Sequence, residues 1–294
     1  MEEVIVKTEF PELRLLKRGK VRDIYDLGDN LLFIATDRIS AFDVVLPDGI
    51  PGKGRVLTQI SIFWFKKMED IIPNQIIETD VGKFPEVLKK YSGILKDRSM
   101  IVKKAQPLPV ECVVRGYLAG SGWKNYEMKR EICGNKLPDG LVQSSKLEEP
   151  IFTPTTKEEQ GHDKDITFGE LKDILGLELA YKVKELSLRI YKRASEIAEK
   201  KGIIIADTKF EFGRYEDNII LIDELLTPDS SRFWSMKGYK LGKSQDSYDK
   251  QIVRDYLLTL KWDKTYPGPH LPENIIKKTS ERYKEILEIL TKVD

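Results

Sequence analysis

Short apolar runs interrupted by turn residues fill the first part of the chain. In residues 13–36, LRLLKRGKVRDIYDLGDNLLFIAT, β-rich runs are separated by turn signals at Arg18-Gly19 and at Gly28-Asp29-Asn30. Short runs with glycine and asparagine between them predict a meander of antiparallel strands. The first hundred residues are therefore expected to be mainly strands and turns.

Two later stretches have other patterns. Residues 56–70 carry apolar side chains at helical spacing and predict a helix. Residues 99–117, SMIVKKAQPLPVECVVRGY, are apolar and rich in β-branched residues, which favour strands. We expect this second stretch to form paired strands that are broken at Pro107 and Pro109.

The second half of the chain combines helix and strand patterns. Apolar positions at steps of three and four predict an amphipathic helix that ends near Gly202. These positions are Val183, Leu186, Ile190, Ala194 and Ile197. Residues 202–225 predict two strands around a turn at 213–218. The tail from residue 246 predicts two helices joined by residues 265–272, TYPGPHLP.

These patterns together predict an α+β fold with two lobes, in which helices pack on antiparallel sheets. We expect a mostly β lobe at residues 1–105, with the turn at Gly19, and an α+β lobe at residues 106–294. The stretch from about residue 133 to 167 is polar and punctuated by proline and glycine. Long polar loops of this kind often carry functional residues.

Composition narrows the class of protein. Lys plus Arg (49) nearly equals Asp plus Glu (48), so the charge does not predict a nucleic-acid partner. No apolar run approaches the length of a membrane span and the N-terminus does not resemble a signal peptide, so we expect a cytoplasmic protein with no membrane partner. Cys112 and Cys133 lack metal-type spacing, and Cys112 is expected to be a small buried hydrophobic residue.

Charged residues alternate along the segment ADTKFEFG. Successive side chains of a strand point to opposite faces, so Asp207, Lys209 and Glu211 should share a face, with Asp223 near them at the end of the partner strand. The opposite face would carry Ala206, Thr208, Phe210 and Phe212. The charged face is either a solvated surface with ion pairs or a site for magnesium and phosphate, because carboxylates suit this hard cation.

A basic turn, KRGKVRDIY, is the second candidate. Gly19 would let backbone amides approach a phosphate, and Lys17, Arg18, Lys20 and Arg22 supply positive charge. The segment matches neither the P-loop nor the dinucleotide fingerprint, and alone it could be a basic surface turn. Together with the carboxylate hairpin it resembles the two-lobed layout of kinases and related enzymes, with a kinase-like or ATP-grasp-like ATP site.

Two clusters of arginine, serine and glycine are suited to anions. VVRGYLAGSGW contains Arg115 and Ser121, and PDSSRFW contains Ser231 and Arg232. A guanidinium with hydroxyl and backbone donors can hold a phosphate or carboxylate, although each segment could also be a capped helix start with a surface arginine. The polar loop TPTTKEEQGHDKD adds Lys157, Gln160, His162 and Asp163.

At these residues the sequence resembles the phosphoribosylaminoimidazole-succinocarboxamide synthase family, the SAICAR synthetases of purine biosynthesis. PVECVVRGYLAGSGW and IIIADTKFEFG resemble the two signature stretches of the family. GKVRDIY, TDRISAFD, TPTTKEEQGHD and DELLTPDSSRFW resemble further blocks, in family order. The likeness runs from about residue 13 to the end, and it is closer to the longer form of the family.

The resemblance implies a SAICAR synthase-like fold and an ATP-dependent carbon–nitrogen ligase with three small-molecule substrates. ATP, carboxyaminoimidazole ribonucleotide (CAIR) and L-aspartate would give SAICAR, ADP and phosphate, with Mg²⁺ as a cofactor. The implied ATP-binding residues are Gly19, Lys20, Lys157 and Glu211. The implied magnesium ligands are Glu211 and Asp223. The implied ribonucleotide-binding residues are Arg115, Ser121, Ser231 and Arg232. The implied catalytic residues, between the substrates, are Asp207, Lys209 and Asp163.

Elementary chemistry makes this reaction reasonable for such residues. A carboxylate does not condense with an amine unaided, so transfer of the γ-phosphoryl group would first give an acyl phosphate that the amine of aspartate attacks. Three anionic reactants must meet, and magnesium with the basic residues would offset their repulsion. No covalent nucleophile of the enzyme is needed.

Two other functions fit part of the pattern. A small-molecule kinase would use the same glycine turn, lysine and carboxylates, but it has no evident need for two separate anion clusters. A non-catalytic nucleotide-binding module would not need Asp207, Lys209 and Glu211 together. The sequence leaves open whether the protein is a monomer or a homodimer.

Overall fold

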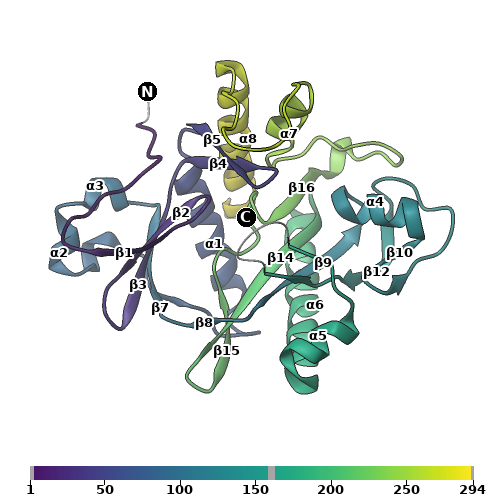
Figure 1. Ribbon diagram of the computed structural model, residues 1–294, viewed down its shortest axis with the longest axis horizontal. Helices are drawn as coiled ribbons and strands as arrows, with labels where there is room; N and C mark the ends of the chain where they lie inside the picture. Colours follow the sequence, from purple (N-terminus) through teal and green to yellow (C-terminus); the bar gives the residue numbers. More distant parts are fainter. Residues whose placement is uncertain (1–2, 158–162, 293–294) are drawn as a thin grey trace.

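Two antiparallel sheets with a helix between them form the body of the protein (Figure 1). The computed structural model describes residues 3–157 and 163–292. The helix, α1 (Lys53–Met68), touches strands of the first sheet on one side and the C-terminal helix on the other. The α+β class and the antiparallel sheets predicted from the sequence are confirmed.

The first sheet has the strand order β1-β2-β3-β7-β6. Its strands are β1 (Arg14–Arg18), β2 (Arg22–Asp26), β3 (Asn30–Ala35), β7 (Ser99–Lys103) and β6 (Ile76–Glu78). The predicted meander at the N-terminal end is confirmed, and Gly28 takes the left-handed conformation in its second turn (φ 86°). Short helices that the sequence patterns did not predict cover this sheet: η1 (Val81–Lys83), α2 (Glu86–Lys89) and α3 (Ser92–Leu95).

The second sheet is built around the long strand β14 (Ile203–Tyr215), with the order β12-β9-β14-β15 and additional strands beside it. The other strands are β8 (Gln106–Pro107), β9 (Val110–Tyr117), β12 (Lys146–Phe152), β13 (Thr155–Thr156), β15 (Asn218–Ile222) and β16 (Ser231–Ser235). The first half of β14 pairs with β9 and β16, and its second half pairs with β15 and β8. Both edges of this strand are therefore occupied along most of its length.

The predicted pairing of strands within residues 99–117 is wrong. β7 pairs with β3 and β6 in the first sheet, whereas β8 and β9 pair with β14 in the second. The chain crosses from one sheet to the other between β7 and β8, so the two halves of this stretch pair with different partners in different sheets. The predicted turn at 213–218 is tighter than expected, because β14 continues to Tyr215 and only Glu216 and Asp217 connect it to β15.

Long helices cover the second sheet and the centre of the molecule. The predicted amphipathic helix is α6 (Leu177–Lys200), which buries one face against β14 and β9. The two predicted C-terminal helices are α7 (Gln251–Leu258) and α8 (Glu273–Thr291). The remaining helices and strands are α4 (Gly120–Lys129), α5 (Phe168–Leu175), η2 (Met236–Gly238), β10 (Glu131–Ile132) and β11 (Asn135–Lys136).

A hairpin from the N-terminal part of the chain packs on the C-terminal helices. It consists of β4 (Arg38–Ala41) and β5 (Val44–Gly49), and its apolar side chains share a core with those of α7 and with Leu271. A division of the chain into lobes at residues 105 and 106 stays a prediction. It falls where the chain crosses between the two sheets.

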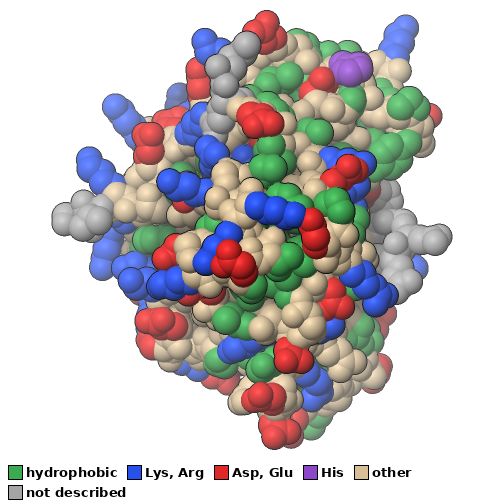
Figure 2. Space-filling model, turned by 90° about the vertical axis from the view of Figure 1, so that its left-hand side faces the viewer, with side chains coloured by type: hydrophobic (Ala, Val, Ile, Leu, Met, Phe, Trp, Pro, Cys, Tyr) green, Lys and Arg blue, Asp and Glu red, His purple; other side chains and the backbone are tan. Residues whose placement is uncertain are grey.

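Charges of both signs are interspersed on the surface. Figure 2 shows them mixed over the face that includes the N-terminal sheet, without a large area of one sign. Among the helices of the described residues, none is long and apolar enough to cross a membrane. Cys112 is fully buried, as predicted.

The apolar face of β14 should be a large contributor to stability. Phe210 is fully buried in the main core, so Phe210→Ala should lower the free energy of unfolding by about 3–5 kcal/mol. Denaturant unfolding followed by circular dichroism measures the change. Leu177→Ala, at a side chain that is 63% exposed, is the control and should change stability little. Equal effects of the two substitutions would contradict this account of the core.

Candidate functional site

The charged residues of β14 lie on one face of the strand. Thr208, Phe210 and Phe212 are almost fully buried on the opposite face, at 0–1% exposure. The prediction that Ala206 lies with them is wrong, because the strand register shifts between Ile205 and Asp207, and Ala206 packs with Tyr117 and Trp234 instead. Asp207, Lys209 and Glu211 alternate with them and therefore share the other face, as the sequence predicts. A single strand thus presents two carboxylates and an ammonium group in a row.

Asp207 lies between two arginines from the neighbouring strands. In the strand register Asp207 faces Arg115 of β9 on one side and Arg232 of β16 on the other. Nη1 of Arg115 lies 3.1 Å from Oδ2 of Asp207, and Arg232 donates to the same oxygen. Asp207 is only 4% exposed and raises the pKa of Arg232 above its ordinary value. One buried carboxylate therefore orients two guanidinium groups.

The first turn of α4 lies directly against these arginines. A Cβ atom at Gly120 would come within 2.2 Å of Nη2 of Arg232, and one at Gly122 within 3.0 Å of Cδ of Arg115. Between these glycines, Oγ of Ser121 accepts a hydrogen bond of 3.2 Å from Nη2 of Arg115. Since no side chain caps the start of α4, guanidinium, hydroxyl and backbone donors meet here in an arrangement suited to a phosphate.

Side chains of alternating charge form a second cluster at the other end of the β14 face. Lys209 donates to Glu111 of β9, Lys157 donates to Glu211, and Arg22 of β2 donates to Asp223 just after β15. In the register of β14 and β15, Glu211 faces Ile222, the residue before Asp223. The predicted convergence of Glu211, Lys209 and Asp223 is therefore supported by the strand pairing.

The pKa values show how strongly these groups affect one another. Burial by itself would raise the pKa of Asp223, but Arg22, Lys157 and Lys209 hold it below its ordinary value. Burial by itself would lower the pKa of Lys209, but Glu111, Glu211 and Asp223 hold it above its ordinary value. Asp223 is thus ionised and Lys209 protonated at neutral pH.

Glu111 has the opposite tendency. Burial raises its pKa above the ordinary value; Lys209 opposes the rise, and Asp163 and Glu211 add to it. Glu111 is only 6% exposed, and its carboxylate accepts a hydrogen bond from Lys209. Burial therefore disfavours the negative charge of Glu111.

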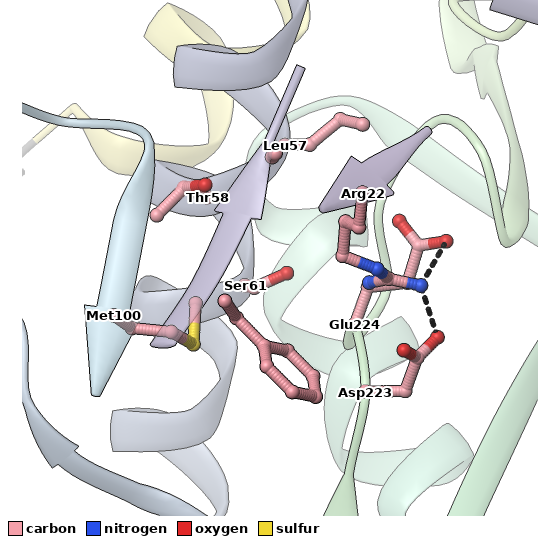
Figure 3. A pocket seen from close by; sticks show the side chains of 9 residues that line it. Arg22, Leu57, Thr58, Ser61, Met100, Asp223 and Glu224 are labelled. Atoms are coloured by element: carbon pink, nitrogen blue, oxygen red, sulfur yellow. Dashed lines mark hydrogen bonds and ion pairs between the residues drawn. The ribbon is translucent and has the colours of Figure 1, made fainter. Parts of the chain in front are cut away.

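Arg22 connects the first sheet to this cluster. Figure 3 shows its guanidinium in a small cavity between the sheets, pointing toward Asp223 and Glu224, with Ser61 and Met100 on other walls. Nη2 of Arg22 lies 3.8 Å from a carboxylate oxygen of Glu224. Because Arg22 follows the Gly19 turn by three residues, this turn must lie near the carboxylates of the second sheet.

The Gly19 turn is held closed by backbone and side-chain contacts. The amide of Gly19 donates to the carbonyl of Arg22 over 2.7 Å. Arg38, from the TDRISAFD segment, donates to the carbonyl oxygens of Gly19 and Lys20 at 2.9 and 3.3 Å. Lys20 pairs with Asp43 of the same segment. A fixed glycine turn with a lysine at its tip suits a nucleotide phosphate.

The donor set at Glu211 and Asp223 is compatible with magnesium. Mg²⁺ is usually held by one or two carboxylates together with substrate phosphates and waters. No group of three or more His, Cys, Asp or Glu side chains that could hold a metal occurs among residues 3–157 and 163–292.

Some predicted residues lie differently from what the sequence suggested. Ser231 is 5% exposed and its hydroxyl hydrogen-bonds to Thr208 at 2.7 Å, so it lies behind Arg232. Asp163 is exposed and close enough to influence Glu111. Gln160 and His162 lie outside the described residues. A direct role of Asp207 in catalysis stays a prediction, since its observed contacts favour a positioning role.

Sequence reasoning overlooked Glu111 and gave Arg22 only a supporting part. Glu111 stands in the apolar strand segment VECVV, where an isolated carboxylate is itself a signal of pairing. Arg22 appeared as one of several basic residues near a turn. Nothing local indicates that its guanidinium reaches a residue 201 positions later in the chain.

Comparison with known proteins gives a consistent result over the whole chain. The family described as SAICAR synthetase matches residues 15–269. A protein of Thermodesulfovibrio yellowstonii named phosphoribosylaminoimidazole-succinocarboxamide synthase is 65% identical over 291 residues, which are 99% of this chain and 100% of the relative. A relative of the same name from Geobacter sulfurreducens is 61% identical, covering 99% of both chains.

Solved structures agree with the sequence comparison. The SAICAR-synthase of Saccharomyces cerevisiae complexed with SAICAR has a TM-score of 0.89 at 46% identity, covering 98% of both chains. A SAICAR synthetase in complex with ADP has a TM-score of 0.69 at 28% identity, covering 95% of this chain and 97% of that one. Both TM-scores indicate that the neighbours share the overall fold of this chain.

Asp207→Asn should destabilise the protein, because two guanidinium groups would lose their shared buried counter-charge. Loss of one partner from a buried ion pair typically costs about 3–5 kcal/mol. Urea unfolding at neutral pH measures the difference from the wild type. Asp217→Asn, in the exposed turn between β14 and β15, serves as the matched control. An unchanged unfolding midpoint for Asp207→Asn would contradict the anchoring role of this carboxylate.

Proposed function

Because the chain belongs to the SAICAR synthetase family, we propose that its two charged clusters bind the ribonucleotide and the metal-bound nucleotide of that family's reaction. The enzyme is an ATP-dependent carbon–nitrogen ligase of purine biosynthesis that joins L-aspartate to CAIR and forms SAICAR, ADP and phosphate. One observation most strongly supports two separate binding clusters. Asp207 fixes a pair of arginines at one point of β14, and Glu211 lies four residues further along the same strand.

The ribonucleotide phosphate would bind where Arg115 and Arg232 meet the start of α4. Each guanidinium already has its position fixed by Asp207, and Arg115 is held further by Thr153 at 3.0 Å. Ser121 would add a hydroxyl donor. Ser231, through its hydrogen bond to Thr208, would act by supporting the backbone beside Arg232. Because these donors are already ordered, they lose little conformational entropy when an anion binds.

ATP would bind between the sheets, with its phosphates at the Gly19 turn. Lys20 and Lys157 would contact phosphate oxygens, and to do so each must leave its present partner, Asp43 and Glu211 respectively. Glu211 and Asp223 would hold Mg²⁺, which would neutralise phosphate charge and polarise the transferred group. The neighbour in complex with ADP supports the use of an adenine nucleotide.

Phosphoryl transfer to the carboxylate of CAIR would give an acyl phosphate, and the amine of aspartate would then displace phosphate from it. Lys209 would stay protonated beside the reacting carboxylate and offset its negative charge. Asp163 would line the same region, near Glu111. The protein would thus contribute mainly position and charge, which can supply a large part of a barrier of this type.

The proposed place of this reaction is the cytoplasm. The two cysteines support it, because both are free thiols in the structure and no disulfide is required for the fold.

The assignment of the magnesium ligands can be tested by removing one charge at a time. Glu211→Gln and Asp223→Asn should each lower turnover by about a hundredfold or more, because each weakens the cation that neutralises the phosphates. Product mass after incubation with ATP, CAIR and aspartate measures turnover, with the aspartate-free mixture as the control for simple kinase activity. Wild-type turnover of either variant at saturating magnesium would rule out the metal assignment.

Arg232→Lys should weaken binding of the ribonucleotide selectively. Lysine keeps the charge but cannot reproduce a guanidinium fork, and a lost charge-assisted contact costs about 1.5–3 kcal/mol, or roughly ten- to more than a hundredfold in affinity. The KM for CAIR should therefore rise strongly and the KM for ATP only slightly. Steady-state kinetics with each substrate varied in turn decide the matter. An equal rise in both KM values would place Arg232 outside the ribonucleotide site.

A further inference from the structure

The backbone of Asp223 has an uncommon conformation. Its φ angle is 68°, in the left-handed region that few residues other than glycine adopt and that aspartate and asparagine visit only occasionally. The residue comes directly after β15, where regular strand pairing with β14 has ended. A carboxylate in such a place keeps its direction only if other contacts hold the backbone.

One buried side chain supplies these contacts. The amide of Asp223 donates to Oε1 of Gln75 over 3.0 Å, and Nε2 of Gln75 donates to the carbonyl of Asp223 over 2.7 Å. Gln75 is only 1% exposed. Both peptide groups of Asp223 are therefore bound by a single carboxamide, in the manner of a strand partner. Only glutamine or asparagine can offer a donor and an acceptor in this pattern.

The backbone of Gln75 also joins the two sheets. Its amide donates to the carbonyl of Leu221 in β15 at 3.0 Å, and its carbonyl accepts from the amide of Lys103 in β7 at 2.8 Å. The preceding residue, Asn74, forms an isolated parallel bridge with Leu221. The backbone of Gln75 thus connects β15 of the second sheet to the last residue of β7 in the first sheet.

We propose that Gln75 is a positioning residue that fixes the left-handed backbone of Asp223 and so aims this carboxylate at the metal. The proposal rests on the proposed function, because it takes Asp223 to be a magnesium ligand. Arg22 acts from the opposite side by pairing with the carboxylate itself. The side chain of Asp223 is therefore oriented by its guanidinium partner, while its main chain is oriented by Gln75.

Variants of Gln75 separate this role from general support of the fold. Gln75→Met removes both hydrogen bonds at similar length, and Gln75→Glu keeps an acceptor but removes the donor. ADP binding is measured by calorimetry with MgCl₂ and again with EDTA. Outer-shell substitutions typically cost about 10–100-fold in metal affinity, so the tightening of ADP binding by magnesium should fall by about tenfold or more. Binding in EDTA should stay within about twofold.

The matched control is Gln59→Met. The side-chain nitrogen Nε2 of Gln59, in α1, donates to the backbone carbonyl of Asp97 at 3.1 Å. This variant should keep the magnesium effect of the wild type. A folded Gln75→Met or Gln75→Glu protein with an undiminished magnesium effect would overturn the inference. If magnesium does not tighten ADP binding even to the wild type, the metal assignment fails first and this inference falls with it.

A measurement on the wild type decides the matter if neither variant folds. The amide of Asp223 should be strongly protected from hydrogen exchange without ligand, because its acceptor is buried. Exchange as fast as that of the exposed turn at Glu216 and Asp217 would show that the carboxamide does not hold this backbone, and would overturn the proposal.

Discussion

Antiparallel pairing on both edges of β14 is the constraint on which the candidate site depends. Strand pairing fixes register, and side chains alternate with a period of two, so a shift by one residue would turn the whole charged face into the core. In the observed register Asp207 faces Arg115 and Arg232, and Glu211 lies beside the end of β15. A register shifted by one residue would also move Phe210 and Phe212 from the core to the charged side, which would destabilise the fold.

Each charge of the site already has a partner from the protein. Lys157 pairs with Glu211, Arg22 with Asp223, and Lys209 with Glu111. Ion pairs satisfy buried charges that would otherwise destabilise the fold. In the proposed function, an anionic substrate or a cation that binds here takes the place of a protein partner in one of these ion pairs. The ion pairs therefore stabilise the site when no ligand is bound.

What the sequence could predict follows from the range of each physical effect. The two faces of β14 are a local property of strand geometry, and the arginine clusters stand beside glycine and serine within a few residues. These features were predicted correctly, except that the shift in register before Asp207 places Ala206 on the same side as the charged residues. The pairing of β9 with β14, and not with β7, depends on which strand offers a partner after folding, and no local pattern encodes that choice. Arg22, Glu111 and Gln75 act on residues about 100 to 200 positions away, so their roles became visible only in three dimensions.

The continuous strand β14 also fixes the distance between the two clusters. Asp207 and Glu211 are four residues apart on one strand, so at about 3.3 Å per residue their backbones are separated by roughly 13 Å. A strand paired on both edges cannot stretch or shorten. In the proposed function, the ribonucleotide binds with its phosphate at the arginines and its reacting carboxylate toward Glu211, so this spacing along the strand sets the distance between the two groups. On the same proposal, a free imidazole carboxylate that lacks the ribose phosphate would reach only one of the two clusters, so the spacing of the clusters would select substrates by their length.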